Sequence, residues 1–293
     1  MADSAVIVRG VGGHYTLHRH DPPFQGLAYL RGILRQEDIR PLVGDRVEYT
    51  SSQDPDIPFV VEKILPRKNV SVRPAVANID SLIITVSIFE PRPDYLLIDR
   101  LIVYARKNHM EPLILITKMD LAKRRAAKRS SEQLLENYAD AEAAIYEAGF
   151  GEADADLQRF KSHLAGKTVA FAGQSGVGKS TKLNEMFGEL SETGAVSEKI
   201  GRGRHTTRET TLYPIEGGGY VADTPGFSVL NLADLDITWR DLREGYAEFE
   251  KASEPCRFED CRHDGDMGCK IDEMTIHPER LARYRILLQE TDF

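Results

Sequence analysis

The chain has 293 residues, of which 41% are hydrophobic and 29% charged, and its 46 acidic and 38 basic side chains give a formal net charge of −8. This length predicts two or three domains, and the acidic balance argues against a protein that coats nucleic acid through bulk charge. The longest apolar stretches, 82–88 and 113–116, fall far short of the ~20 residues that span a bilayer, and Asp3 stands where an export signal would be basic, so we expect neither a membrane nor a secreted protein.

Residues 1–72 are predicted to form a small β-barrel. Short apolar runs are separated by turn-forming glycines, and the runs are 5–8, 15–17, 27–34, 46–49 and 59–61. Five strands in this length suit an OB-type barrel better than an immunoglobulin sandwich, and the pattern alone leaves both open. Basic side chains are scattered over the segment and face either RNA or solvent: Arg9, His18, Arg19, His20, Arg31, Arg35 and Arg40.

Residues 73–233 change to strands that alternate with helical periodicity, which is typical of a parallel α/β sheet. Continuous apolar runs predict buried strands at 82–86, 113–116, 168–172 and 220–222. Leu97, Leu101, Tyr104 and Ala105 have the spacing of one helix face. A basic run from Lys123 to Arg129 is interpreted as a solvated face.

An eight-residue motif inside this second segment predicts a phosphate-binding loop. It matches G-x-x-x-x-G-K-[ST] between a strand and a helix, and it consists of Gly173, Gln174, Ser175, Gly176, Val177, Gly178, Lys179 and Ser180. Backbone N–H groups of such a loop and the helix N-terminus point at phosphate oxygens. Lys179 would bridge the β- and γ-phosphates, and the Ser180 hydroxyl would bind Mg²⁺.

The base is predicted to be read by four residues that follow the strand at 113–116, namely Thr117, Lys118, Met119 and Asp120. The Asp120 carboxylate can accept hydrogen bonds from N1–H and the N2 amine of guanine, whereas adenine offers no donor at N1. The stem of Lys118 can cover the base while its head reaches the phosphate loop. Thr117 stands where asparagine is usual, and its hydroxyl can still make one tethering bond.

Two further segments complete the predicted triphosphate site. Asp223 and Gly226 form D-x-x-G after a strand, so Asp223 would hold Mg²⁺ through water and the Gly226 amide would contact the γ-phosphate. Residues 201–208 form a basic, glycine-rich switch loop in which Thr207 would complete the Mg²⁺ shell. His205 is the candidate that positions water, because Phe227 replaces the usual glutamine.

The base-reading motif precedes the phosphate loop, which reverses the ordinary order and predicts a circularly permuted GTPase. A parallel sheet tolerates this order because loops at the carboxyl edge of its strands converge whatever their sequence.

Residues 234–293 are predicted to form a mostly helical metal-binding domain that ends in a helix at 278–288. All three cysteines lie here, and Cys256, Cys261, His263 and Cys269 have the spacing of a closed tetrahedral Zn²⁺ site. Four protein ligands leave no open position, so one Zn²⁺ would be structural. His277 is a spare candidate that we interpret as a surface residue. Cysteines confined to one cluster predict a reducing, cytoplasmic location.

Taken in this order, the motifs make the chain closely resemble the ribosome small subunit-dependent GTPase (RsgA, YjeQ) family over essentially its whole length. The resemblance implies an OB-fold, a permuted GTPase domain and a zinc domain. It further implies late maturation of the bacterial small ribosomal subunit, rRNA binding, and GTP hydrolysis stimulated by that subunit. It assigns nucleotide binding to 117–120 and 173–181, which adds Thr181, Zn²⁺ binding to the four-ligand cluster, and a catalytic role to His205.

One departure from the family concerns the loop that backs the guanine base. Residues 149–166 show only acidic, helix-like sequence, and the connection is short for the strand that should precede this loop. The loop is therefore expected to be degenerate or shortened. This departure leaves open an ATP-using P-loop kinase or ATPase. A second alternative, from another class, is a nucleotide-regulated RNA-binding scaffold whose hydrolysis is incidental. We expect a monomer that binds GTP or GDP with Mg²⁺ and no membrane.

Overall fold

The computed structural model describes residues 3–32, 40–72, 75–121, 125–147, 149, 154–188, 210–223, 232, 235–251 and 254–291. The chain divides into two compact units, each built from separate stretches of sequence. The first unit comprises residues 1–80, 163–171 and 180–226, and the second comprises 81–162, 172–179 and 227–293. The three domain ranges expected from the sequence stay a prediction.

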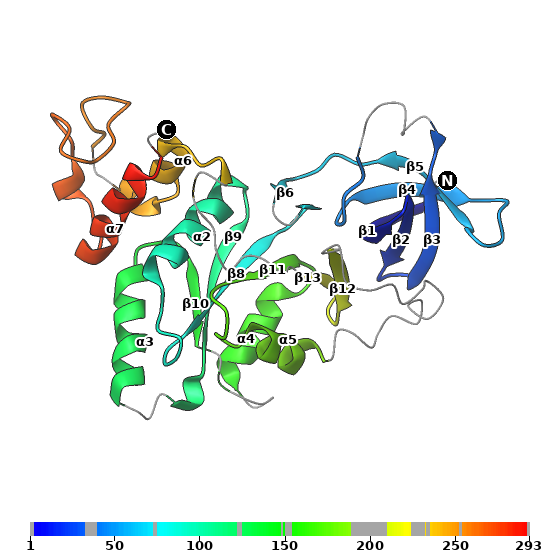
Figure 1. Ribbon diagram of the computed structural model, residues 1–293, viewed down its shortest axis with the longest axis horizontal. Helices are drawn as coiled ribbons and strands as arrows, with labels where there is room; N and C mark the ends of the chain where they lie inside the picture. The colour runs from blue at the N-terminus through cyan, green and yellow to red at the C-terminus, as the bar shows by residue number, and fades with distance from the viewer. Residues whose placement is uncertain are drawn as a thin grey trace. The chain divides into compact units, whose positions relative to one another are not determined.

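The first unit begins with a closed five-stranded barrel in the order β1-β2-β3-β5-β4 (Figure 1, blue). Its strands are β1 (Asp3–Val11), β2 (His14–Arg19), β3 (Phe24–Leu30), β4 (Arg46–Ser51) and β5 (Phe59–Ile64). Alternate side chains point inward, as the two-residue period of a strand requires, and Ile7, Leu17, Ala28, Val47 and Val61 are fully buried. The predicted N-terminal barrel is confirmed. A small antiparallel sheet of β6 (Val70–Val72) and β7 (Ala75–Ala77), which the sequence did not predict, follows it.

The first unit also holds three strands of the central segment in the order β11-β13-β12. These are β11 (Thr168–Ala172), β12 (Thr211–Ile215) and β13 (Gly219–Asp223), and α5 (Lys179–Phe187) follows β11 along the chain. β11 and β13 run parallel, whereas β12 and β13 form an antiparallel hairpin. The parallel pairing predicted for the central strands is confirmed for β11 and β13, and the antiparallel strand β12 is one that the sequence analysis did not predict. This strand lies at the edge and contains Pro214, a residue that edge strands tolerate, so it lacks the apolar run of a buried strand.

The second unit holds three parallel strands in the order β10-β9-β8. They are β8 (Ser81–Ser87), β9 (Glu111–Thr117) and β10 (Ala144–Glu147), and the helices beside them are α2 (Tyr95–Lys107), α3 (Arg125–Tyr138) and α4 (Ala155–Leu164). All seven residues of β8 are buried, as strands covered on both faces should be. The predicted face of α2 is confirmed, because Leu97, Leu101, Tyr104 and Ala105 are all buried, and Asp94 caps the helix.

β10 corrects the expectation that the connection is too short for a further strand. The strand lies just before residue 149 and pairs in parallel register with β9. Its four side chains are exposed or half-buried, because it lies at the edge and pairs with one neighbour. This short strand therefore does not show the continuous apolar run by which β8 and β9 are recognised. The loop expected to back the base would begin at residue 148, and most of it lies outside the described residues.

The C-terminal part is mostly helical, as predicted. It contains α6 (Trp239–Glu244), the short 3₁₀ helices η3 (Ala247–Lys251) and η4 (Ile271–Glu273), and α7 (Pro278–Gln289). Its core includes a buried charge network in which Arg280 donates hydrogen bonds to Asp99 of α2 and to Glu248 of η3. Arg283 adds a bond of 2.6 Å to the other Asp99 oxygen. These ion pairs join α7 to α2.

Among the described residues, no helix is long and apolar enough to cross a membrane.

Candidate functional site

The predicted phosphate loop connects β11 to α5 with the backbone conformation that its glycines permit. Gly173 has φ +129°, and a Cβ at this position would lie 2.3 Å from the carbonyl oxygen of Thr85, so only glycine fits. Lys179 begins α5, and its Nζ donates to the carbonyl oxygens of Gly173 (2.7 Å) and Gln174 (2.6 Å). Burial lowers the pKa of this ammonium group. The loop therefore curls around the lysine that the sequence assigns to phosphate.

The residues predicted to read the base are hydrogen-bonded to this same loop. Thr117 is 1% exposed, and its hydroxyl donates to the carbonyl oxygen of Val177 at 2.6 Å and lies 3.2 Å from that of Val86. Lys118 Nζ donates to the carbonyl oxygen of Gly176 at 3.1 Å, the contact that the sequence predicts. Two motifs that lie about 60 residues apart in the chain thus meet, although their order is reversed.

The turn after β9 presents Asp120 to solvent. Lys118 has φ +61°, an uncommon conformation for a residue with a side chain, and such conformations cluster at functional sites. Asp120 follows in the 3₁₀ helix η1 (Met119–Leu121) and is exposed. Its carboxylate is therefore accessible to a ligand beside the phosphate loop. The assignment of Asp120 to guanine stays a prediction.

A third segment at this edge was missed by the sequence analysis. The loop after β8 carries a cis peptide between Glu90 and Pro91. The carbonyl oxygen of Glu90 accepts hydrogen bonds from Lys118 Nζ and from the Ser87 hydroxyl (3.2 Å). The loop is thereby hydrogen-bonded to the turn that carries Lys118 and Asp120. Two prolines directly after a buried strand, at positions 91 and 93, were the signal that could have located it, because carboxyl ends of parallel strands form ligand sites.

Several predicted residues lie outside what the structure describes. Asp223 ends β13, as the D-x-x-G motif requires, but its side chain, Gly226, and the whole segment 201–208 with His205 and Thr207 are not described. Ser180 and Thr181 are exposed in the first turn of α5. The assignments of these residues to Mg²⁺, nucleotide and water stay predictions.

The three cysteines and His263 converge as a group that can hold a metal ion. Their ligand atoms all lie within 4.8 Å of one another. His263 Nδ1 is 3.6 Å from the sulfur atoms of Cys256 and Cys261 and 3.4 Å from that of Cys269. Metal–ligand bonds of about 2.0–2.3 Å in a tetrahedron place ligand atoms about 3.5 Å apart, so the donor set fits Zn²⁺. His277 instead caps α7 by accepting from the Glu279 N–H at 3.3 Å.

Neighbouring groups hold the metal-binding loop, residues 256–269, in place. Asp266 accepts from the Arg262 N–H at 3.1 Å, and the His263 ring packs on Phe249 with centroids 4.4 Å apart. Burial raises the pKa of the Cys261 thiol to about 12 and lowers the pKa of His263. Without a metal the thiol is protonated at neutral pH, so a metal must displace its proton.

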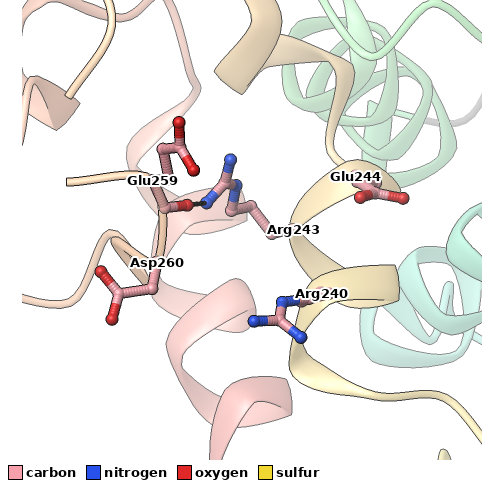
Figure 2. A pocket seen from close by; sticks show the side chains of 5 residues that line it. All are labelled: Arg240, Arg243, Glu244, Glu259 and Asp260. Carbon is pink, nitrogen blue, oxygen red and sulfur yellow. Dashed lines mark hydrogen bonds between the residues drawn. The ribbon is translucent and has the colours of Figure 1, made fainter.

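A pocket of about 420 Å³ lies beside the metal-binding loop and is lined by both acidic and basic side chains. Figure 2 shows Arg240, Arg243, Glu244, Glu259 and Asp260 around it. The guanidinium of Arg243 donates to the carbonyl oxygen of Glu259 at 2.5 Å, so this side chain fastens the loop to α6. None of the five belongs to the residues predicted to bind nucleotide or metal.

Several of the basic barrel residues named in the sequence analysis have partners within the described part of the chain. Arg31 pairs with Glu62, and Arg19 donates to the carbonyl oxygen of Pro22 at 3.1 Å. His18 and His20 are half-buried and hydrogen-bond to β13. Arg35 lies outside the described residues.

Comparisons with known proteins agree with this architecture. The RsgA GTPase model matches residues 64–233, and the RsgA N-terminal domain model matches residues 6–56. Small ribosomal subunit biogenesis GTPase RsgA of Ruminiclostridium cellulolyticum is 38% identical, over 95% of this chain and 90% of that protein. Its counterpart in Caldanaerobacter subterraneus is 39% identical, over 97% of this chain and 94% of that protein.

Solved structures show the same likeness over almost the whole chain. YjeQ from Thermotoga maritima superposes with a TM-score of 0.81 at 30% identity, covering 99% of both chains. YloQ, described as a circularly permuted GTPase, gives 0.80 at 29% identity, covering 99% of this chain and 95% of that one. The reversed motif order, the barrel, the Cys₃His group and these matches have one explanation: the chain belongs to the RsgA GTPase family.

Proposed function

We propose that this protein is a GTPase that acts in late maturation of the bacterial small ribosomal subunit. The observation that carries the proposal is the hydrogen bonding of Thr117 and Lys118 to Val177 and Gly176. These bonds link the turn predicted to read guanine to the loop predicted to bind phosphate, which supports the binding of one nucleotide by both segments. The two relatives named above are small ribosomal subunit biogenesis GTPases, which supports the same activity here.

The nucleotide is held by residues with separate tasks. Lys179 and the N–H groups of 173–181 bind the phosphates, because a curled loop followed by a helix N-terminus favours anions. Asp120 accepts from the guanine edge, and Lys118 covers the base. Adenine would cover the Asp120 carboxylate without donating to it, and a group that is covered and left unpaired in this way costs ~1–3 kcal/mol.

Mg²⁺ would be held by Ser180, by Thr207 and, through water, by Asp223, and it would offset charge on the phosphates. We assign the orientation of the attacking water to His205, because Phe227 has no polar group for that task. Zn²⁺ on the Cys₃His group would be structural, since all four positions are filled by protein ligands. It would shape the loop that Arg243 fastens to α6.

The barrel and the zinc domain are proposed to contact the subunit and its rRNA, with domain ranges 1–72, 73–233 and 234–293. We further infer that the protein is cytoplasmic, because its proposed partner is the maturing small ribosomal subunit. We also infer that it is a monomer.

GTP turnover measured with and without purified small subunits tests this function. We expect strong stimulation by the subunits, and tighter co-sedimentation with them in a non-hydrolysable GTP analogue than in GDP. Unstimulated turnover with RNA binding would instead indicate a scaffold. Competition against bound labelled GDP is the companion measurement: displacement by ADP as effective as by GDP would contradict the guanine assignment.

A further inference from the structure

The β12–β13 hairpin has an unusual position in the sequence relative to the predicted switches. β12 begins at Thr211, three residues after the predicted switch loop 201–208, and β13 ends at Asp223, the first residue of D-x-x-G. Both ends of one hairpin therefore lead into segments that the proposed function assigns to the triphosphate. A group that holds this hairpin in position therefore also holds Thr211 and Asp223, the hairpin residues from which those two segments lead.

Two histidines of the barrel contact this hairpin. His18 on β2 has its Nδ1 3.0 Å from the hydroxyl of Tyr220, and His20 Nε2 donates to the carbonyl oxygen of Gly219 at 3.0 Å. The three rings pack edge-on or tilted, with centroids 4.8 Å apart for the histidine pair, 5.5 Å for His18 and Tyr220, and 4.8 Å for His20 and Tyr220. β1 of the barrel also lies against β12. The barrel therefore holds both strands of the hairpin.

The hydrogen bond between His18 and Tyr220 is uncharged at neutral pH, and its tyrosine is largely removed from water. Tyr220 is 6% exposed. Burial, together with the neighbouring His20, lowers the pKa of His18 to about 4, and burial raises the pKa of Tyr220 to about 12. At neutral pH the pair is an uncharged hydrogen bond, which salt does not screen as it screens an exposed ion pair.

The strand that receives the contact can carry a displacement forward. A Cβ on Gly219 would lie 2.3 Å from the carbonyl oxygen of Lys167, so the start of β13 is packed closely against the segment before β11. From Tyr220 the strand runs directly to Asp223, over about 10 Å at 3.3 Å per residue. Its ladder pairs Tyr220 with Thr168 and with Pro214. Tyr220 and Asp223 therefore belong to one continuous strand, along which a shift at Tyr220 would reach the backbone of Asp223.

We propose that His18, His20 and Tyr220 are positioning residues that couple the barrel to the GTPase reaction. What binds the barrel sets the position of the β12–β13 hairpin, and the hairpin sets the Mg²⁺-side geometry at Asp223. This inference rests on the proposed function, because it takes the partner of the barrel to be subunit RNA. Coupling is reciprocal, so the nucleotide state also reaches the barrel.

The test compares the double variant H20F/Y220F with wild type and with Y29F. The double variant keeps aromatic rings but removes the His20–Gly219 bond and the Tyr220 hydroxyl. Y29F is the matched control, because Tyr29 is a half-buried barrel residue whose hydroxyl lies 3.4 Å from Ser52 Oγ, within the barrel itself. The readouts are co-sedimentation with small subunits, the ratio of subunit-stimulated to unstimulated turnover, and amide hydrogen exchange.

We expect the stimulation ratio of the double variant to fall roughly fivefold or more, within the range that coupling residues produce, while co-sedimentation stays unchanged. Y29F should keep the wild-type ratio. In the free protein, replacing GDP by a GTP analogue should change exchange in β2 of wild type and Y29F, and this change should disappear in the double variant.

An unchanged ratio in the double variant would overturn the inference, even if exchange in 211–223 became faster, because the contact would then be structural only. Absence of stimulation in wild type would refute the proposed function instead. The exchange difference in β2 would then decide the coupling alone: its persistence in the double variant would overturn the inference, and its loss would support it.

Discussion

Replacing Thr117 by valine tests whether the hydrogen bonds of this side chain hold the phosphate loop in place. The substitution keeps the shape of the side chain but removes a hydroxyl that is buried and lies 2.6 Å from the carbonyl oxygen of Val177. Val177 is itself fully buried, so its carbonyl loses a partner that water does not replace. Leaving such a group unpaired costs about 1–3 kcal/mol.

We expect this cost in two measurements. The free energy of unfolding should fall by about 1–3 kcal/mol in a denaturant titration. If the loop relaxes to recover a partner for Val177, the nucleotide must restore its conformation, and the affinity for GDP should fall by about 5- to 150-fold.

Thr85→Val is the matched control for Thr117→Val. Thr85 lies on the neighbouring strand β8, is 1% exposed, and its hydroxyl has no hydrogen-bond partner among the described residues. Removing that hydroxyl should be neutral or stabilising. Equal losses of stability and GDP affinity in both variants would refute the reasoning, because they would show that the loop depends on packing at this edge and not on the Thr117 hydrogen bond.

Four further predictions follow from the remaining parts of the molecule. Asp120→Asn should weaken GDP binding about tenfold or more and improve binding of xanthosine diphosphate. Competition of the two nucleotides against bound labelled GDP measures both changes. Unchanged GDP binding would show that Asp120 does not belong to the site. Cys261→Ser should lower the zinc content measured by atomic absorption and destabilise the C-terminal part; a full equivalent of zinc in the variant would contradict the four-ligand site. Arg280→Met should destabilise the fold by about 3–5 kcal/mol, because it leaves the buried Glu248 carboxylate without its ion-pair partner and Asp99 with Arg283 alone. Urea unfolding followed by the fluorescence of the single tryptophan checks this, and Arg159→Met, on an exposed ion pair, should cost under about 1 kcal/mol. The pKa of His18 is lowered to about 4 in the folded state. Its contribution to stability is therefore complete above the unfolded pKa of about 6.5 and is lost as the pH falls toward 4. His18→Gln should remove this part of the pH dependence of the free energy of unfolding, and the same pH dependence in the variant and in wild type would refute this prediction.

The barrel strands, β8, β9, α2 and α7 could be predicted because their patterns are local. Apolar runs or alternation identify each of them, and a proline marks the start of α7. β10 and β12 escaped prediction because both lie at sheet edges, where half-exposed side chains and Pro214 obscure the period. The phosphate loop and the Cys₃His group were recognisable because each is defined by particular residue types at short, fixed spacings in the sequence. The Glu90–Pro91 loop has no such spacing, and only its hydrogen bonds to Lys118 and Ser87 reveal its part in the site.

The sequence by itself determined the chemical capacities of this protein: a loop for phosphates, a carboxylate for a base, four soft donors for a metal, and the reversed order of the first two. These capacities depend on residue types at short spacings, which the chain carries whatever its fold. The tertiary structure alone decided which distant residues meet, because each such contact closes a long loop whose entropy only collective packing offsets. The hydrogen bond from Thr117 to Val177, the contact of His18 with Tyr220 some 202 residues away, and the burial of Arg280 against Asp99 all arise in this way.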